Sequence, residues 1–562
     1  MGDEIASAGQ RRRSRGRLYS AALCACAALV LVGCSKISQS TAPISQAGTI
    51  PGTLRYADIE EPISMNPLLR LTAVGTDMDM FIFGFFFNLD DKMRLIPELA
   101  TVVPSYQNGG ISKDGLTLTY HLRHGVKWHD GAPFDSHDVV FTVHAILNPD
   151  NNLVSRNGWD RIASVDAPDK YTVRIHLKKI YAAALTTYFA ETGLYPVLPA
   201  HLLEKYPNLN QVPFNTNPVG TGPFKFVRWV HGDRVELEAN PLYWRGPPKL
   251  KRIIYKIIPS ETTIMTQLQT HEVDAWFRAP SDLYPQIQKL SAMGFRVQLS
   301  PALVYAHLDL NQKDPIFQDV RVRRALAMAV DRKRIVHDVT HDVYVVAYSD
   351  LPPLSWAYEP DVPHYDYDPA AASRMLDDAG WKLGDDGIRV KDGQRLAFNI
   401  SAAAGAKTPE AVEQILQSDF RKIGVDASIK NYPTALFFDS YQRGGIIQAG
   451  KYESALYSWV TGADPGGDES LYATWNISPA GENALWWSDP KLDRAEVGAL
   501  SSYDQRARKP YYSIIQKEIA SQAVTIVLYF QRQIFVTADG FKNFVPAPAT
   551  TSNWNTWEWE MK

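Results

Sequence analysis

Residues 457–470, YSWVTGADPGGDES, combine acidic side chains with two aromatic residues, three glycines and a proline. The acids could act as a general acid and base in catalysis, or could bind a cationic group of a ligand. The glycines and the proline oppose a helix or a long strand, and Trp459 is unusual for a purely exposed loop. The segment therefore predicts a loop that is catalytic, ligand-binding or only structural.

Residues 128–139, WHDGAPFDSHDV, gather two histidines and three aspartates between His129 and Asp138. Such a group could bind a metal ion. However, Asp130-Gly131 is also a hairpin-turn signal, and Asp135 or Ser136 could cap a following helix. We favour the structural interpretation, a turn followed by a helix.

A second histidine pair lies in residues 337–343, HDVTHDV, where His337 and His341 are four positions apart. On one helix face this spacing suits zinc. The segment lacks the HExxH motif and offers no obvious third ligand. We favour a solvated helix end, and we predict no metal site and no cofactor.

Glycines in residues 218–224, PVGTGPF, raise the question of phosphate binding. A phosphate-binding loop requires more glycines, a Lys-Ser or Lys-Thr pair, or the start of a helix. Here Pro223 and a predicted strand follow, so Gly220 and Gly222 are expected to shape a tight turn. The sequence also contains no GxSxG and no Cys–His pattern. Its one SxxK spacing, Ser488–Lys491, lacks the SDN and KTG motifs that accompany it in SxxK enzymes, so no residue pattern supports an enzyme.

Length and charge narrow the function further. The 562 residues exceed one ordinary core and predict two or three domains. Hydrophobic residues make up 45% and charged residues 21%, as in soluble globular proteins. The net charge is −3 and the body has no basic run, so nucleic-acid binding is not expected.

The N-terminal residues are typical of an export signal. Five arginines between positions 11 and 17 precede an apolar stretch at 18–32, which is too short to span a bilayer comfortably. The stretch ends in Leu31-Val32-Gly33-Cys34, which is similar to the lipobox of bacterial lipoproteins. We predict a signal peptide at 1–33, lipidation of Cys34 and a membrane-anchored tether at 34–50; an ordinary signal peptide is the alternative.

Cysteine usage agrees with this prediction. The three cysteines, Cys24, Cys26 and Cys34, all lie within or at the end of the signal segment. The exported body would therefore contain no disulfide, no catalytic thiol and no zinc–thiolate site.

The body alternates strand and helix patterns, which indicates an α/β fold. Residues 116–128 alternate and suit a strand pair, and further strand patterns begin at 234 and 251. Helices are predicted after Asp368-Pro369, after Thr408-Pro409 and after Asp319, and glycines end the first two at Gly380 and Gly424.

Several segments together resemble one family, the extracellular solute-binding proteins of ABC importers of the oligopeptide/dipeptide-binding type, family 5. The most specific block is DGLTLTYHLRHGVKWHDGAPFDSHDVVFT at 114–142. Other similar elements occur in the family's order. They are EPISMNP (61–67), IPELA (96–100), PVGTGPFKF (218–226) with NPLYWRG (240–246), LQTHEVDAW (268–276) and DVRVRRALAMAVDRKRIV (319–336).

The resemblance covers about residues 50–562 and implies a two-lobed, periplasmic-binding-protein-like clamp of type II with an extra inserted domain. Domain I would comprise 51–84, 213–305 and 525–562, domain II 85–212, and domain III 306–524. The chain would cross between the lobes near 305 and near 525, and the ligand would lie between the lobes.

The same resemblance implies where the ligand is bound. Phe277 and Arg278 follow EVDAW where the family places pocket residues, Tyr529 and Phe530 lie at the second crossing, and Trp459 matches the family's loop tryptophan. Hinge or core packing is the alternative for each. We favour a binding role for Arg278, whose charge must face water or an anion, such as a ligand carboxylate.

One departure concerns the acidic anchor. Peptide binders of this family place an Asp three residues after the loop tryptophan to hold the peptide's amino terminus, and this chain has Gly462 there. Asp464 is predicted to replace it. If it does not, the ligand is not a free-amine peptide, and nickel chelates, haem, oligosaccharides or opines remain open.

The predicted function is therefore capture of a di- or oligopeptide by a monomer and its delivery to a membrane permease that separate ATPase subunits drive. An extracytoplasmic hydrolase is the alternative from another class.

Overall fold

The computed structural model describes residues 48–70, 72–153, 155–193, 195–548 and 552–562, and the side chains of 468–470 are not described. The predicted signal peptide, Cys34 and most of the tether lie outside the described residues. The residues from Thr49 to Lys562 form one compact unit. No helix within the described ranges is long and apolar enough to cross a bilayer.

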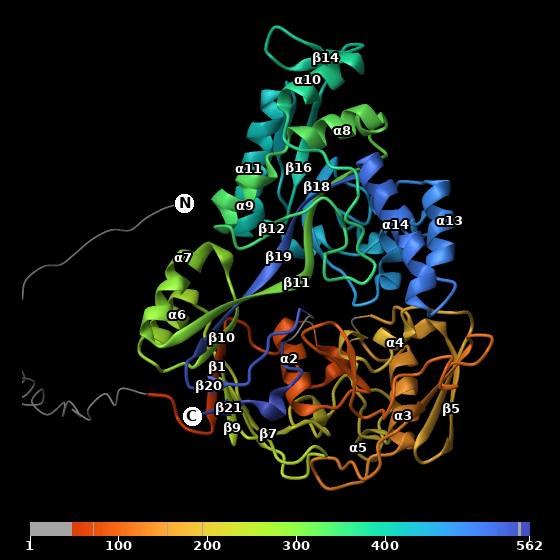
Figure 1. Ribbon diagram of the computed structural model, residues 1–562, viewed down its shortest axis with the longest axis vertical. Helices are drawn as coiled ribbons and strands as arrows, with labels where there is room; N and C mark the ends of the chain where they lie inside the picture. Colours follow the sequence, from red (N-terminus) through yellow and green to blue (C-terminus); the bar gives the residue numbers. More distant parts are fainter. Residues whose placement is uncertain (1–47, 71, 154, 194, 549–551) are drawn as a thin grey trace, which may run out of the picture. The chain divides into compact units, whose positions relative to one another are not determined.

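The central element is an 11-stranded mixed sheet (Figure 1). Ten strands follow one another across it, and β12 (Val345–Val346) pairs with β19. In spatial order they are β17 (Asp426–Ile429), β16 (Ala397–Ser401), β18 (Ser454–Val460), β11 (Phe295–Leu310), β19 (Thr525–Ala538), β10 (Ala275–Ala279), β1 (Thr53–Asp58), β9 (Arg252–Ile257), β8 (Arg234–Ala239) and β7 (Phe224–Val230).

Besides the central sheet, the described residues form four smaller sheets. The order is β4 (Thr117–His121), β6 (Thr172–Leu177) and β5 (Ile162–Asp169) in one three-stranded sheet, and β13 (Lys382–Leu383), β14 (Arg389–Lys391) and β15 (Gln394–Arg395) in the other. Two pairs remain, β2 (Phe87–Leu89) with β3 (Leu95–Pro97), and β20 (Phe541–Lys542) with β21 (Glu560–Met561). The strand pair predicted at 116–128 is wrong, because this segment forms only β4. The partner of β4 is β6, about 55 residues further along the chain.

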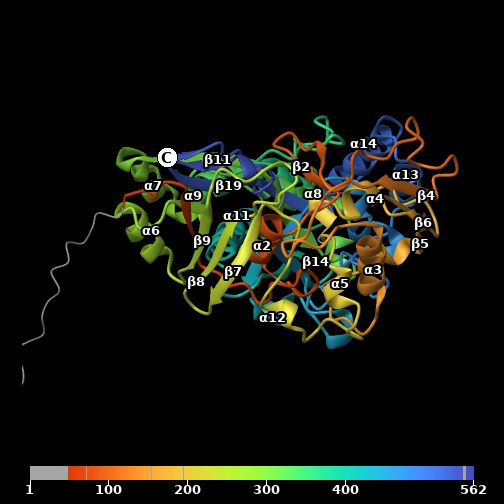
Figure 2. The same ribbon diagram turned by 90° about the horizontal axis from the view of Figure 1, so that it is seen from below.

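The helices pack on the sheets and around their ends (Figures 1 and 2). They are α2 (Ala73–Ile82), α3 (Ser136–Leu147), α4 (Ala184–Thr187), α5 (Ala200–Leu203), α6 (Glu261–Gln269), α7 (Tyr284–Ile287), α8 (Val320–Ala329), α9 (Arg332–Thr340), α10 (Pro369–Asp378), α11 (Lys407–Lys422), α12 (Thr434–Phe437), α13 (Pro490–Ala499) and α14 (Gln505–Gln522). The mixture confirms the predicted α/β class.

Caps determine where the predicted helices begin. Asp319 and Asp368 cap α8 and α10 with their carboxylates, as predicted. The expected start of α11 at Thr408 is wrong, because the helix begins at Lys407. The Glu410 carboxylate accepts the Gly405 N–H at 2.7 Å, which holds the chain before the helix without a capping hydroxyl.

Two long strands connect separate hydrophobic cores. β11 and β19 pair antiparallel over most of their lengths, with register shifts between Pro301 and Tyr305 and between Ala306 and His307. At one end their side chains join the core around α6 and β10, and at the other end they join the core around α8 and α11. These strands are where the predicted crossings lie, and their irregular pairing leaves a point at which the sheet can bend.

Most buried apolar residues of the predicted domain II belong to one continuous core with Leu54 and Tyr56 of β1 and with the buried apolar residues of β8 and β9. Phe81 in α2 meets Phe224 in β7 edge to face in this core. The Tyr503 hydroxyl, between α13 and α14, donates to the Gly115 carbonyl at 3.1 Å and so joins residues of the predicted domains III and II. Figure 2 shows α2 beside β7.

Candidate functional site

The turn at 218–224 is held by the end of α2. The Gly222 N–H donates to the Ile82 carbonyl at 2.8 Å. A Cβ on Gly220 would lie 1.8 Å from the same carbonyl oxygen, so no larger residue fits there. The glycines therefore shape a tight turn, as predicted, for a reason that lies in the distant helix.

The His129 ring is part of this turn and not of a metal site. Its Nδ1 accepts the Gly220 N–H and its Nε2 lies 3.1 Å from the Gly222 carbonyl, to which it donates. Burial lowers the pKa of His129 to about 4, so the ring is neutral at pH 7. Asp135 caps α3 in a capping box with Asp138, which confirms the predicted turn and helix.

His337 and His341 do not share a helix face, because α9 ends at Thr340 and His341 adopts a left-handed conformation with φ of 51°. His337 instead lies 3.0 Å from a carboxylate oxygen of Asp342. Among the described residues, no group of three or more histidine, cysteine or acidic side chains is arranged to hold a metal ion.

The segment of Trp459 borders a cavity of about 230 Å³, here named the hydroxyl cavity. One wall is formed by residues 459–467 and the other by residues 155–195 of the predicted domain II. Side chains with hydroxyl groups predominate on the second wall, and they are Ser155, Tyr181, Thr186, Thr187, Thr192 and Tyr195. Such a lining suits a neutral polar or aromatic group.

Trp459 is half-buried at the end of β18, and Asp464 lies in the loop that follows. Both Asp464 carboxylate oxygens bond the Arg508 guanidinium, at 2.5 and 2.6 Å, and one also accepts the Gly466 N–H. The side chain of Arg508 is 1% exposed and that of Asp464 8%. Asp464 thus balances a buried arginine of α14 and fixes the loop. The predicted contact of Asp464 with a ligand ammonium stays a prediction.

A second cavity, of about 280 Å³, lies beside β19 and is here named the arginine cavity. Its lining includes Arg278, Arg532, Gln531 and Gln533, together with apolar residues of β11. Val460 borders both cavities. The two cavities therefore flank the end of β18, on either side of one side chain.

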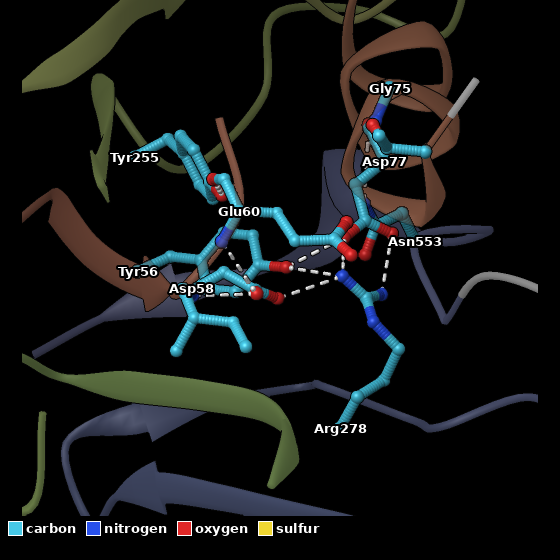
Figure 3. A network of polar contacts seen from close by, with 10 residues as sticks. Tyr56, Asp58, Glu60, Gly75, Asp77, Tyr255, Arg278 and Asn553 are labelled. Atoms are coloured by element: carbon cyan, nitrogen blue, oxygen red, sulfur yellow. Dashed lines mark hydrogen bonds and ion pairs between the residues drawn. The ribbon is translucent and has the colours of Figure 1, made fainter. Parts of the chain in front are cut away.

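Arg278 is held in a charged network at the ends of β1 and β10 (Figure 3). Its Nη2 lies 2.7 Å from an Asp77 oxygen and 3.0 Å from an Asp58 oxygen, and Nη1 lies 3.1 Å from the other oxygen of Asp77. The Tyr56 hydroxyl lies 3.2 Å from Nη2 and donates to Asp77 at 2.6 Å. Burial raises the pKa of Asp58, and the neighbouring Arg278 opposes this shift.

The backbone of Arg278 is strained. Its φ of 56° is left-handed, and the residue lies where the pairing of β10 with β19 shifts register between Trp276 and Ala279. Such irregularities redirect a side chain, and strained backbone concentrates at functional sites. The geometry thus agrees with a binding role for Arg278.

The other three predicted site residues line neither cavity. Phe277 is buried and stacks on Phe544, with ring centroids 4.8 Å apart. Tyr529 stacks on Tyr344 and belongs to the core around α8 and α11. Phe530 packs in a small core with Tyr305. The structure thus gives these three residues core contacts, and their ligand contacts stay predictions.

Sequence reasoning missed Arg532, Asp58 and Asp77. The signal for Arg532 was present, because the polar run Gln531–Gln533 interrupts an otherwise apolar strand. Nothing local marks Asp77, which lies in α2 and meets Arg278 from about 200 residues away.

Comparison with known proteins agrees with the family resemblance seen in the sequence. Residues 94–482 match the model of bacterial extracellular solute-binding proteins, family 5 Middle. The oligopeptide-binding protein AppA of Bacillus subtilis (strain 168) is 28% identical over 516 residues, which are 90% of this chain and 91% of that protein. The glutathione-binding protein GsiB of Pectobacterium atrosepticum is 28% identical over 498 residues, 87% of this chain and 90% of that protein.

A solved structure is similar to this chain over most of its length. NikZ from Campylobacter jejuni, in complex with Ni(L-His), is 30% identical with a TM-score of 0.74, and the match covers 91% of this chain and all of that chain.

Proposed function

Since this chain belongs to the family 5 bacterial extracellular solute-binding proteins, we propose that it captures a di- or oligopeptide between its lobes and delivers it to the permease of an ABC importer. Two relatives support the peptide as ligand, the oligopeptide-binding AppA and the glutathione-binding GsiB. The observation that carries the proposal is the pair of cavities flanking Val460, which would receive neighbouring parts of one extended ligand.

The periplasmic-binding-protein fold supplies the mechanism. β11 and β19 connect the lobes, with domain boundaries near 305 and 525, and the interrupted pairing at Pro301–Tyr305 serves as the bend. A peptide that touches both walls of the hydroxyl cavity favours the closed arrangement by its differential affinity. Trp459 then forms an apolar wall for a peptide side chain.

The chain acts by binding and not by turnover. Asp464 borders the hydroxyl cavity, but its carboxylate is paired with Arg508. The neutral His129 is held by backbone groups, so neither side chain is free to act as a base. Incubation with a library of dipeptides to pentapeptides tests this. Thermal stabilisation with intact peptides supports the binder, whereas peptide cleavage would establish the hydrolase instead.

The same assay includes Ni(L-His), because NikZ was solved in complex with it. Stabilisation by Ni(L-His) but by no peptide would replace the peptide as the ligand and leave the solute-binding function intact.

Proteins of this family are extracytoplasmic. We further infer that Cys34 carries the lipid that holds this chain on the membrane, and that the protein works as a monomer.

A further inference from the structure

The arginine cavity differs from the hydroxyl cavity in charge. Two arginines and two glutamines line it, and none of its described lining residues is acidic. Much of the remaining surface is apolar, from Ala302, Leu303 and Val304 of β11 and from Tyr344. A cationic group in a partly apolar hollow binds an anion more strongly than a cation on an open surface, because less water screens it.

Arg532 supplies the uncompensated charge. It is half-buried on β19, opposite Pro301 of β11, and its side chain makes no hydrogen bond or ion pair with any described residue. Arginine is seldom buried without a partner. Arg532 lies beside the interrupted pairing of β11 and β19 and lines the arginine cavity. A ligand bound between the lobes would therefore meet its guanidinium.

Arg278 is the second donor, and its place is fixed. The carboxylates of Asp58 and Asp77 both face it and occupy its two terminal nitrogens (Figure 3). The Nε–H of Arg278 has no partner within the described residues. The cavity thus combines one fixed guanidinium, which two carboxylates neutralise, with one unpaired guanidinium, so Arg532 carries the free positive charge.

We propose that the arginine cavity is a carboxylate subsite. Arg532 binds the carboxylate of the captured solute and Arg278 adds a donor beside it, while the neutral part of the ligand extends past Val460 into the hydroxyl cavity. The proposal rests on the proposed capture of a ligand between the lobes, and it defines the ligand class as a peptide or similar solute with a carboxylate at the end that lies beside β19.

The test compares ligands and variants by calorimetric titration. The peptide that binds most tightly in the library is used as the free acid, as the C-terminal amide, and with any acidic side chain replaced by its amide. One of the two amide forms should bind the wild type about 10- to 100-fold more weakly, which identifies the carboxylate that is bound. In Arg532→Gln this difference should disappear. Arg374→Gln removes the same charge from the exposed face of α10 and should leave the difference unchanged.

A second measurement does not depend on peptide binding. Crystals soaked in sodium bromide should show an anomalous peak beside the Arg532 guanidinium in the wild type and none in Arg532→Gln. An unchanged acid-to-amide ratio in Arg532→Gln would overturn the subsite even though peptides bind. If no peptide binds, the capture of peptides is contradicted, and the bromide peak alone decides the subsite, which its absence would overturn.

Discussion

At the scale of single residues, the ion pair between Asp464 and Arg508 gives Asp464 a structural role in the loop that follows β18. Asp464→Ala would leave Arg508 buried without a counter-ion, which costs about 3–5 kcal/mol of stability. We therefore expect a clearly lower Tm, measured by thermal unfolding followed by circular dichroism.

The matched control is Asp338→Ala, which removes an exposed carboxylate 3.3 Å from Arg334 and should change stability by less than about 1 kcal/mol. An Asp464→Ala variant with the wild-type Tm and greatly weakened peptide binding would show that Asp464 holds the ligand directly.

His129 gives a prediction for pH dependence. The unfolded chain binds a proton on this ring near its ordinary pKa of 6.5, whereas the folded chain binds it only near 4. Between these values the unfolded state takes up more protons, so stability falls as the pH falls through this window, by about 2 kcal/mol at pH 5. His129→Gln, which retains an acceptor and a donor, should lose less stability between pH 7 and pH 5 in chemical denaturation.

The control for this prediction is His137→Gln, at a side chain that is 66% exposed. It should follow the wild-type pH profile. An identical pH profile for His129→Gln and the wild type would contradict the assigned role of the buried ring.

At the scale of elements, the 218–224 turn packs so closely against the end of α2 that there is no room for a side chain at Gly220. Gly220→Ala would place a methyl group 1.8 Å from the Ile82 carbonyl oxygen, so the turn or the helix end must move. We expect a loss of at least about 3 kcal/mol or failure to accumulate as folded protein. Gly467→Ala, where a Cβ would meet nothing within 4 Å, should keep the wild-type Tm. Equal Tm values for both variants would contradict this packing.

The elements also show what the sequence could and could not predict. The capped helices α8 and α10 were predicted because their signals are local, and α11 was misplaced at its start because the Gly405–Glu410 contact substitutes for a cap. The turn glycines were predicted, but their partner Ile82 was not, because it lies about 140 residues away.

Contacts between distant parts of the chain also limited the prediction of the site. Trp459, Asp464 and Arg278 line the two cavities and were found by resemblance to the family. The pairing of Asp464 with Arg508 and of Arg278 with Asp77 depends on elements that meet only after folding. Phe277 was predicted as a pocket residue, whereas the aromatic side chains around it form a core that a single strand does not reveal.

At the scale of the whole molecule, the proposed membrane anchoring depends on Cys34. Cys34→Ala should abolish the proposed lipidation, because it removes the thiol that would carry the acyl chain. We expect the wild type to partition into the detergent phase of Triton X-114 and to sediment with membranes, and the variant to do neither. A wild-type protein that remains in the aqueous phase would favour the ordinary signal peptide.

The central claim is that the exported chain holds a peptide between its lobes. Native mass spectrometry of protein purified without refolding tests it most directly, because the natural ligand is then weighed together with the chain. We predict one bound peptide per chain, released intact and identifiable by fragmentation. A co-purified mass that is not a peptide, or an empty protein that afterwards binds no member of the peptide library, would contradict the account.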